Sequence, residues 1–155
     1  MDREEAEARH PATPNVLRIE DTHQRIRSDL EVLEKRDDLG QIDDAVNDLP
    51  GLLKEHFRDE EKLGGLYDEI ASLRPRLGSQ LEILRQEHRE IIGALQGLLG
   101  QLRRVDEMTR SGELPRLHDD IRVSKAVFLK LIHQHERVES RLVADTYYME
   151  DGGSG

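Results

Sequence analysis

Residues 81–98, LEILRQEHREIIGALQGL, carry the pattern that decides the fold of this chain. Their apolar side chains recur every three or four residues, as on the buried face of an amphipathic helix. His88 occupies one of these inward-facing positions. Because a polar group at a core position is costly unless something binds it, His88 is a candidate for a buried functional residue.

The same pattern occurs earlier in the chain, in residues 16–33, VLRIEDTHQRIRSDLEVL. The two segments align without gaps at an offset of 65 positions (88 − 23), which matches His23 with His88. A second pair of segments, 49–63 and 128–142, aligns at an offset of 79 (135 − 56), and each carries HxxxE on its apolar face. The alignment predicts two similar helix pairs related by a pseudo-two-fold axis.

Proline, glycine and aspartate residues divide the chain into four long helical segments. We expect these helices at about 14–36, 41–62, 75–110 and 115–149. Thr13 can cap the first helix with Pro14 at its first position, whereas Asp37, Asp38 and Gly40 should end it. Four helices of this length with short connections predict an all-α, antiparallel up-down-up-down four-helix bundle.

Two details of the second helix follow from its composition. Pro50 has no N–H and crowds the preceding turn, so a kink or a short break is expected there. Leu63 belongs to the predicted apolar face, and Gly64 with Gly65 should end the helix. A short extra helix at 66–73 is then expected before the third long helix.

Length and composition indicate one small domain. The chain has 155 residues, of which 35% are hydrophobic and 36% are charged, as suits a small bundle with charged outer faces. We expect a disordered or frayed N-terminal leader over residues 1–13, the bundle over 14–149 and a flexible C-terminal tail over 150–155.

Charge and cysteine content exclude several functions. The formal net charge of −10 argues against nucleic acid or an anionic membrane as a partner. The chain has no cysteine, so it has neither disulfides nor a thiolate metal site. We see no signal peptide and no apolar run near the ~20 residues of a membrane span, so a cytoplasmic protein is expected.

The inward-facing polar residues of the four helices form a set of metal-ligand types. The set is His23, His56, Glu60, His88, His135 and Glu139. Residues four apart share one helix face, so each HxxxE pair can reach one central point. Imidazoles with carboxylates suit iron, manganese or zinc.

If both glutamates bridge two metals, each metal receives two imidazole nitrogens and two carboxylate oxygens. An oxo or hydroxo bridge would add a fifth ligand and leave one position open for a small molecule.

This H…HxxxE…H…HxxxE pattern resembles the hemerythrin-like family, also called the HHE cation-binding domain, over about residues 14–149. The resemblance implies a non-haem di-iron centre, with two Fe2+/Fe3+ ions held by the six residues. Oxygen-carrying hemerythrins have HxxxH and HxxxxD motifs, whereas this chain has Ile92 and Ser140 at those positions. It instead resembles the branch that includes proteins of iron-centre repair, catalase-type bacterial proteins and an iron-sensing domain.

The resemblance therefore implies a di-iron protein that binds O2, H2O2 or NO in oxidative or nitrosative stress, with catalase-like or other di-iron oxidoreductase activity as the candidate reaction. An alternative is a non-catalytic module that senses or stores iron or a diatomic gas, and a third is a structural bundle carrying adventitious zinc. The sequence leaves the metal in vivo, the redox partner and the oligomeric state open.

The remaining candidate residues are expected to lie away from the centre. Three histidines are predicted at the surface, namely His10, His118 and His133. Five glutamates are predicted on solvated faces, namely Glu20, Glu55, Glu61, Glu87 and Glu136. For Tyr67, Tyr147 and Tyr148 we favour packing at the rim of the bundle over a hydrogen bond to the metal site.

Overall fold

In a computed structural model of the chain, the described residues are 9–36, 38–105 and 114–148. The helices within them are α1 (Pro14–Glu34), α2 (Leu39–Val46), α3 (Leu49–Glu61), α4 (Leu66–Leu73), α5 (Gly78–Arg103) and α7 (Leu114–Thr146), with a 3-10 turn at Pro75–Leu77. The only β-type pairing in the described residues is an isolated bridge between His10 and Tyr147.

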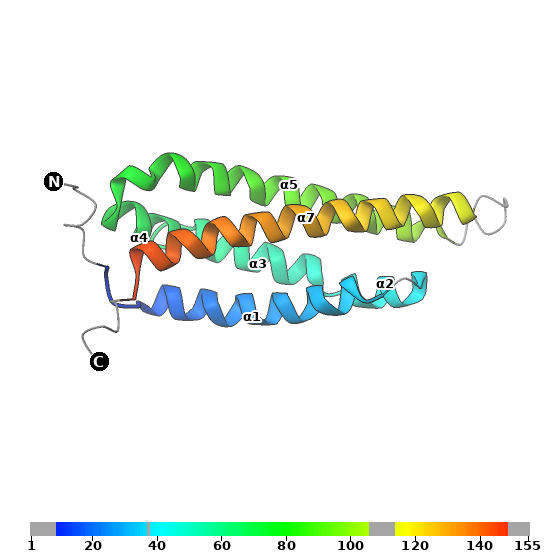
Figure 1. Ribbon diagram of the computed structural model, residues 1–155, viewed down its shortest axis with the longest axis horizontal. Coiled ribbons are helices and arrows are strands. Elements are labelled where there is room, and N and C mark those ends of the chain that lie inside the picture. The colour runs from blue at the N-terminus through cyan, green and yellow to red at the C-terminus, as the bar shows by residue number, and fades with distance from the viewer. Residues whose placement is uncertain (1–8, 37, 106–113, 149–155) are drawn as a thin grey trace.

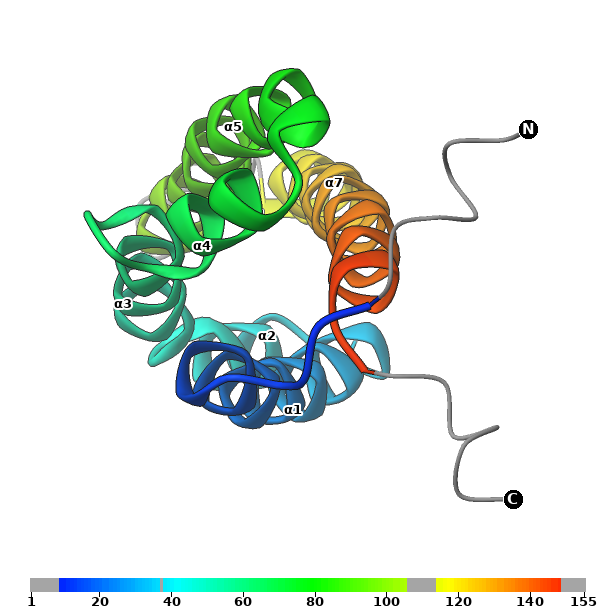
Figure 2. The ribbon, with the colours of Figure 1, turned by 90° about the vertical axis from the view of Figure 1, so that its left-hand side faces the viewer.

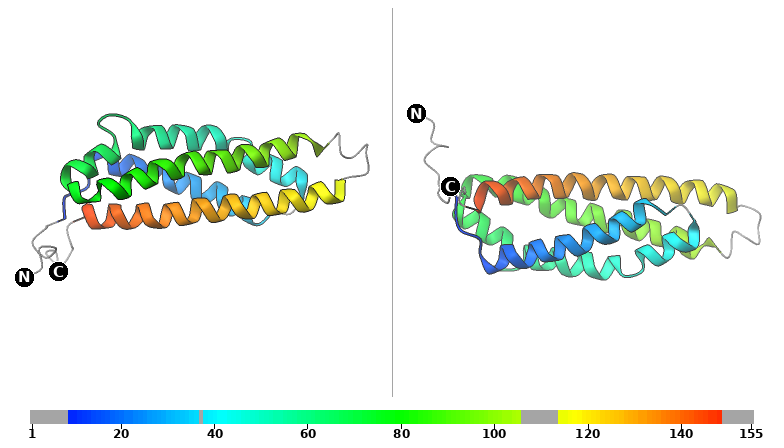
Figure 3. Two further views of the ribbon diagram at one scale, coloured as in Figure 1. Left: turned by 90° about the horizontal axis from the view of Figure 1, so that it is seen from above. Right: turned by 60° about the horizontal axis from the view of Figure 1, so that its bottom comes forward.

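The long helices form the predicted up-down-up-down bundle. α1 runs away from the end where the described termini lie, α3 returns, α5 runs away again and α7 returns (Figure 1). Seen end-on, α1, α3, α5 and α7 follow one another around the bundle, so that α7 lies next to α1 (Figure 2). α4 covers the end near the termini, whereas α2 lies towards the opposite end (Figure 3).

The predicted break in the second helix is confirmed. α2 ends at Val46 and α3 begins at Leu49, which places Pro50 in the first turn of α3, where a missing N–H costs no helical hydrogen bond. Asp38 was expected to help end the first helix, but its side chain accepts hydrogen bonds from the backbone N–H groups of Gly40 and Gln41. It therefore caps α2 instead.

α1 begins at Pro14 and α4 spans Leu66–Leu73, as predicted, whereas several other helix ends differ from prediction by a few residues. α1 ends at Glu34, α5 begins at Gly78 after the 3-10 turn and ends at Arg103, and α7 ends at Thr146. The remainder of the predicted third helix, from 106, and Met149 lie outside the described residues. So do residues 1–8 of the predicted leader and the whole of the predicted tail at 150–155. Near the leader's end, the backbone N–H of His10 donates to the carbonyl of Thr146 at 2.8 Å.

The core consists of two apolar clusters with a polar layer between them. The cluster near the termini includes Val16, Leu66 and Leu81, and the remote cluster includes Leu30, Leu95 and Phe128. The buried residues of α1 and α5 match the predicted repeat position by position. The polar layer therefore falls where the repeat places its histidines.

Leu63 is an exception to the predicted core. It is 95% exposed, because α3 ends at Glu61 and the chain turns at Gly64, whose φ is +75°. In the sequence, the periodic pattern of apolar residues extends to Leu63, two residues beyond the end of α3.

None of the described helices combines the length and the apolar character that crossing a membrane requires.

Candidate metal centre

The six predicted donors converge in the polar layer between the two apolar clusters. His23 comes from α1, His56 and Glu60 from α3, His88 from α5, and His135 and Glu139 from α7. All six are buried, with exposed fractions from 0% for Glu60 to 7% for His23. Residues more than a hundred positions apart in the sequence thus meet at one place.

Their ligating atoms form two overlapping groups of four. The α1–α3 group consists of His23 and His56 with Glu60 and Glu139, and the α5–α7 group consists of His88 and His135 with the same glutamates. Within each group the ligating atoms lie within 4.8 Å of one another. Because both glutamates belong to both groups, their carboxylates lie between the two pairs of imidazoles.

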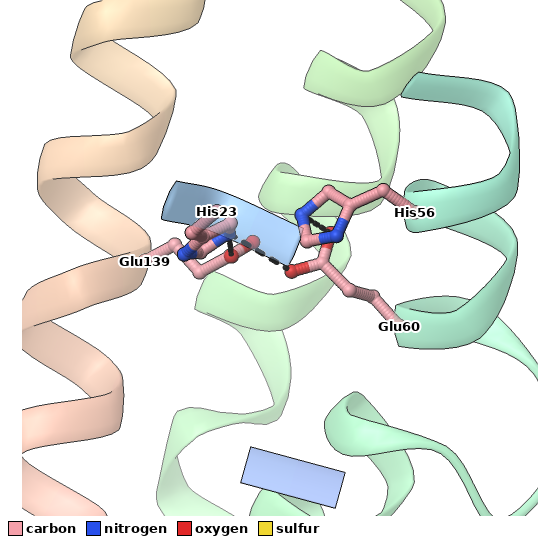
Figure 4. Close-up of side chains that lie close together, drawn as sticks. All are labelled: His23, His56, Glu60 and Glu139. Carbon is pink, nitrogen blue, oxygen red and sulfur yellow. Dashed lines mark ion pairs between the residues drawn. The ribbon is translucent and has the colours of Figure 1, made fainter. Parts of the chain in front are cut away.

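The contacts repeat with the expected pseudo-two-fold symmetry. Within one helix, Nε2 of His56 lies 3.4 Å from Oε1 of Glu60, and Nε2 of His135 lies 3.3 Å from Oε2 of Glu139. Across the bundle, His23 Nε2 lies 2.8 Å from Glu139 Oε1, and His88 Nε2 lies 3.2 Å from Glu60 Oε1. Figure 4 shows the α1–α3 group, with the carboxylates of Glu60 and Glu139 directed toward each other from opposite helices.

Burial keeps two of the four imidazoles neutral. Desolvation, followed by repulsion from neighbouring histidines, lowers the pKa of His56 and of His88 to about 3. Both rings are therefore neutral at physiological pH. A neutral imidazole with a free nitrogen lone pair is the form that binds a metal ion.

The two carboxylates repel each other in this buried site. Burial and then the charge of Glu139 raise the pKa of Glu60 well above its ordinary value. For Glu139 burial acts in the same direction, but its interactions with the Glu60 carboxyl group and with His135 and His23 outweigh burial and hold its pKa well below the usual range. The pair thus retains a proton unless a positive charge compensates for it.

The residues present fit a pair of metal ions. Both carboxylate oxygens of Glu60 are buried without a hydrogen-bond partner among the described residues, which is costly for a polar group. Each group offers two nitrogens and two oxygens, a set typical of borderline divalent metals. Two such ions would bind the unpartnered oxygens and stabilise both carboxylates in their charged form.

Tyr67 lies beside the site, so the favoured prediction of rim packing is wrong for this residue. Its side chain is 0% exposed. The phenol donates a hydrogen bond of 2.6 Å to Oε2 of Glu139, and the phenol oxygen lies 3.0 Å from Nε2 of His88. Tyr67 therefore orients a donor that both groups share.

The turn before α4 brings Tyr67 to this position. Gly64 has φ +75°, and a Cβ on Gly65 would lie 2.5 Å from the carbonyl oxygen of Asp59. Only glycine allows so close an approach. The Gly64–Gly65 pair therefore folds α4 back over the end of α3, and this pair was the available sequence signal.

Glu61 and Glu87 were predicted to lie on solvated faces, away from the centre. Glu61 is exposed and Glu87 is partly buried, but both contact a histidine of the site. Oε2 of Glu61 lies 2.7 Å from Nδ1 of His88, and Oε1 of Glu87 lies 2.9 Å from Nδ1 of His135. A carboxylate on the outer nitrogen holds a histidine so that its other nitrogen faces a metal. Both glutamates are adjacent in sequence to a predicted donor, and this adjacency was the missed signal.

Phe57 was also missed as part of the site. Its ring stacks on the imidazole of His88, with centroids 3.8 Å apart and an interplanar angle of 9°. It follows His56 directly in the sequence, yet it packs against a histidine of another helix. Phe57 therefore fixes the plane of His88 and shields it from water.

The other predicted surface residues belong to neither group of donors. His133 pairs with Glu34 at 2.5 Å on the outer side of α7. Glu20 and Glu55 are exposed, whereas His10, His118 and Glu136 are partly buried. Burial raises the pKa of Glu136, so its predicted location on a fully solvated face needs correction.

At the end of the bundle, Tyr147 is buried and donates a hydrogen bond of 2.7 Å to Glu69. Tyr148 is 40% exposed and donates a hydrogen bond to Glu20.

The fold and this set of buried histidines and glutamates define a metal-binding helical module. The family model of the hemerythrin HHE cation-binding domain matches residues 16–146, and the chain belongs to this family. No curated protein and no solved structure gave a significant match to the chain.

Proposed function

We propose that the chain is a non-haem di-iron protein in which the six buried residues hold two iron ions. The α1–α3 group and the α5–α7 group would each hold one ion, and Glu60 and Glu139 would bridge them. The observation that carries this proposal is that the same two carboxylates belong to both groups of ligating atoms. Zinc or manganese could occupy the same donors.

The bound pair, with an oxo or hydroxo bridge, would supply redox chemistry and an open position for O2, H2O2 or NO. The chain supplies the environment. The imidazoles donate nitrogens, Tyr67 holds Glu139, and the apolar clusters exclude bulk water. We place the function in oxidative or nitrosative stress, as peroxide disproportionation or protection of iron centres.

A non-catalytic sensor or storage module is the alternative. The observation that favours it is the deep burial of the donors, of which even His23 is only 7% exposed. Such burial suits retention of a bound metal ion or gas.

Metal analysis of protein produced with added iron tests the proposal first. We expect about two iron ions per chain and near-ultraviolet and visible absorption, which a zinc site lacks. A metal content below about one ion per chain would refute the di-iron assignment. Glu55→Ala serves as a control, because Glu55 lies on the same helix as Glu60 but is exposed.

Oxygen evolution from hydrogen peroxide then separates the two functions. The iron-loaded protein should release oxygen if it disproportionates peroxide, whereas a sensor or storage module should not. Glu139→Ala should abolish any such release together with metal binding, because Glu139 belongs to both groups of donors.

A further inference from the structure

A cavity lies between α1 and α7, beside the donors of the α1–α3 group. Its volume is about 290 Å³, and His23 forms part of its wall. His23 is also the most exposed of the six donors, at 7% against 2% or less for the others. The cavity therefore reaches the site at the donor that is least enclosed.

The buried part of this wall is apolar apart from His23. It is formed by Val16, Ile19, Leu66 and Val143, all of which belong to the core cluster near the termini. A charged molecule would have to leave water for these side chains, at a cost of several kcal/mol. A small uncharged molecule would not meet this barrier.

The rim of the cavity is polar. It is lined by exposed residues, namely Glu20, Gln24, Arg27, Ser140, Ala144 and Tyr148. Tyr148 donates a hydrogen bond to Glu20, which holds its ring across the seam between α7 and α1. Tyr148 thus narrows the opening.

The packing of the helices explains why the cavity lies here. α5 and α7 contact each other along much of their length, whereas contacts between α1 and α7 are sparse. On α7, Ser140 and Ala144 are four residues apart and present small side chains to this seam. Residues four apart lie on one helix face, so the space that these two small side chains leave between α7 and α1 is continuous.

A second groove that touches a donor is less suited to access. It lies between α3 and α5, and Phe57, Glu61 and His88 line it. There the outer nitrogen of His88 is paired with Glu61, and Phe57 covers the ring. A molecule in this groove meets the far side of the imidazole, away from the carboxylates.

We propose that the α1–α7 cavity is the access route by which a small uncharged molecule, such as a diatomic gas or a peroxide, reaches the buried centre. Side chains at Ala144 and Tyr148 set the width of its opening. This inference rests on the proposed function, because it presupposes a metal centre that takes an external ligand. The cavity has room for several water-sized molecules, so a ligand of two heavy atoms passes without rearrangement of the floor.

The test is the rate at which nitric oxide binds to the reduced, iron-loaded protein, followed by stopped-flow absorbance. Ala144→Phe fills the opening and should slow binding by at least about tenfold, because a closed route requires an opening motion before each association. Gln24→Phe repeats the obstruction from the α1 side. Tyr148→Ala widens the rim and should accelerate binding by about threefold or more.

Gly93→Phe is the matched control. Gly93 lines the α3–α5 groove, and a Cβ there meets nothing within 4 Å, so the variant adds the same ring at the competing route. Its rate should stay within about twofold of the parent rate. Unchanged rates in both Ala144→Phe and Gln24→Phe, or slow binding in Gly93→Phe, would overturn the proposed route. An unchanged rate in Tyr148→Ala would show that Tyr148 does not set the width of the opening.

Metal content separates this inference from the proposed function. If the parent protein binds no iron pair, the proposed function fails before any rate is measured. If all variants carry the parent amount of iron and reach the same final spectrum, a difference in rate reports on the access route alone.

Discussion

The two halves of the centre have the same ligand types but different surroundings. In the α5–α7 group, Glu61 and Glu87 hold the outer nitrogens of His88 and His135, and Phe57 stacks on His88. In the α1–α3 group, Nδ1 of His56 has no hydrogen-bond partner among the described residues, and His23 borders a cavity. In one half, outer carboxylates hold both histidines, whereas in the other half His23 borders the cavity between α1 and α7.

This difference teaches that a repeated ligand pattern does not produce two equivalent positions. Orientation by second partners stiffens a ligand and tunes its basicity, and in the α5–α7 group both histidines have such a carboxylate partner. We expect the α5–α7 position to bind its metal more tightly and the α1–α3 position to take the external ligand. The following experiments test this asymmetry, beginning with the largest expected effect.

Loss of a shared carboxylate should empty both metal positions, so that no difference between them remains. Glu60→Ala or Glu139→Ala should lose most of the metal from both positions, because each glutamate belongs to both groups. The melting temperature of the metal-loaded protein should fall by more than about 10 °C, since metal binding free energy contributes to folding. Elemental analysis and thermal unfolding measure both effects. Glu55→Ala should change neither, and full metal retention by Glu60→Ala would contradict the bridging role.

Removal of one histidine from each half should give unequal results. His23→Ala should empty the α1–α3 position and leave the other position occupied. His88→Ala should empty the α5–α7 position, and it also deprives Phe57 and Glu61 of their partner. The second variant should therefore be less stable than the first by about 2 kcal/mol in chemical denaturation. Equal stabilities and equal metal loss would show that the halves are equivalent.

Neutral replacement of the outer carboxylates should weaken one position only. Glu61→Gln or Glu87→Gln should lower the affinity of the α5–α7 position by about 10- to 100-fold, because the histidine loses its orienting partner. Competition with a chelator measures the two affinities separately. Glu90→Gln, an exposed change on α5, is the control. A uniform loss at both positions would count against the proposed asymmetry.

Glu69 stabilises the end of the bundle that carries Tyr67, so protonation or replacement of Glu69 should destabilise that end. Burial raises the pKa of Glu69, but hydrogen bonds from Thr13, Tyr147 and Asn15 outweigh burial and bring the pKa below its ordinary value. A lowered pKa in the folded state means that the ionised carboxylate stabilises the fold at neutral pH, and this contribution is lost as pH falls through the folded-state pKa.

Glu69→Gln should accordingly lower the melting temperature at pH 7 by a few degrees, roughly the effect expected for one or two hydrogen bonds. The difference from the parent protein should shrink as the pH is lowered into the acid range. Thermal unfolding over a series of pH values measures it. A difference that stays constant with pH would mean that ionisation of Glu69 does not support this end of the bundle.

The smallest effect is expected at His133. His133→Ala should leave metal content and spectrum unchanged and alter stability by less than about 1 kcal/mol, because its contact with Glu34 is an exposed ion pair. The variant tests the phase of α7, since His133 and His135 point to different sides of the helix. Loss of metal from His133→Ala would place the wrong histidine in the centre.

Much of the fold follows from the periodicity of the sequence. The buried positions of α1 and α5 coincide with the predicted repeat, because a helix that buries one face needs apolar residues at intervals of three and four. The pairing of His56 with Glu60 and of His135 with Glu139 follows from the same geometry. Leu63 shows its limit, since periodicity does not say where a helix ends.

Glu61, Glu87 and Tyr67 could not be placed in this way. Glu61 and Glu87 contact histidines of the next helix around the bundle, and Tyr67 contacts residues of α5 and α7. Such contacts depend on the rotation and distance of neighbouring helices. The spacing of apolar residues shows which face of one helix is buried, but it does not give the rotation of that helix relative to its neighbours or its distance from them.

The sequence by itself determined a four-helix bundle with six polar groups facing inward. In a helix, the spacing between residues decides which side chains share a face. Only the tertiary structure decided that one pair of histidines is held by outer carboxylates while the other borders a cavity. The cavity arises because α7 packs closely on α5 but makes few contacts with α1. The outer carboxylates reach histidines of the neighbouring helix, and the closeness of helices far apart in sequence depends on the packing of the whole core.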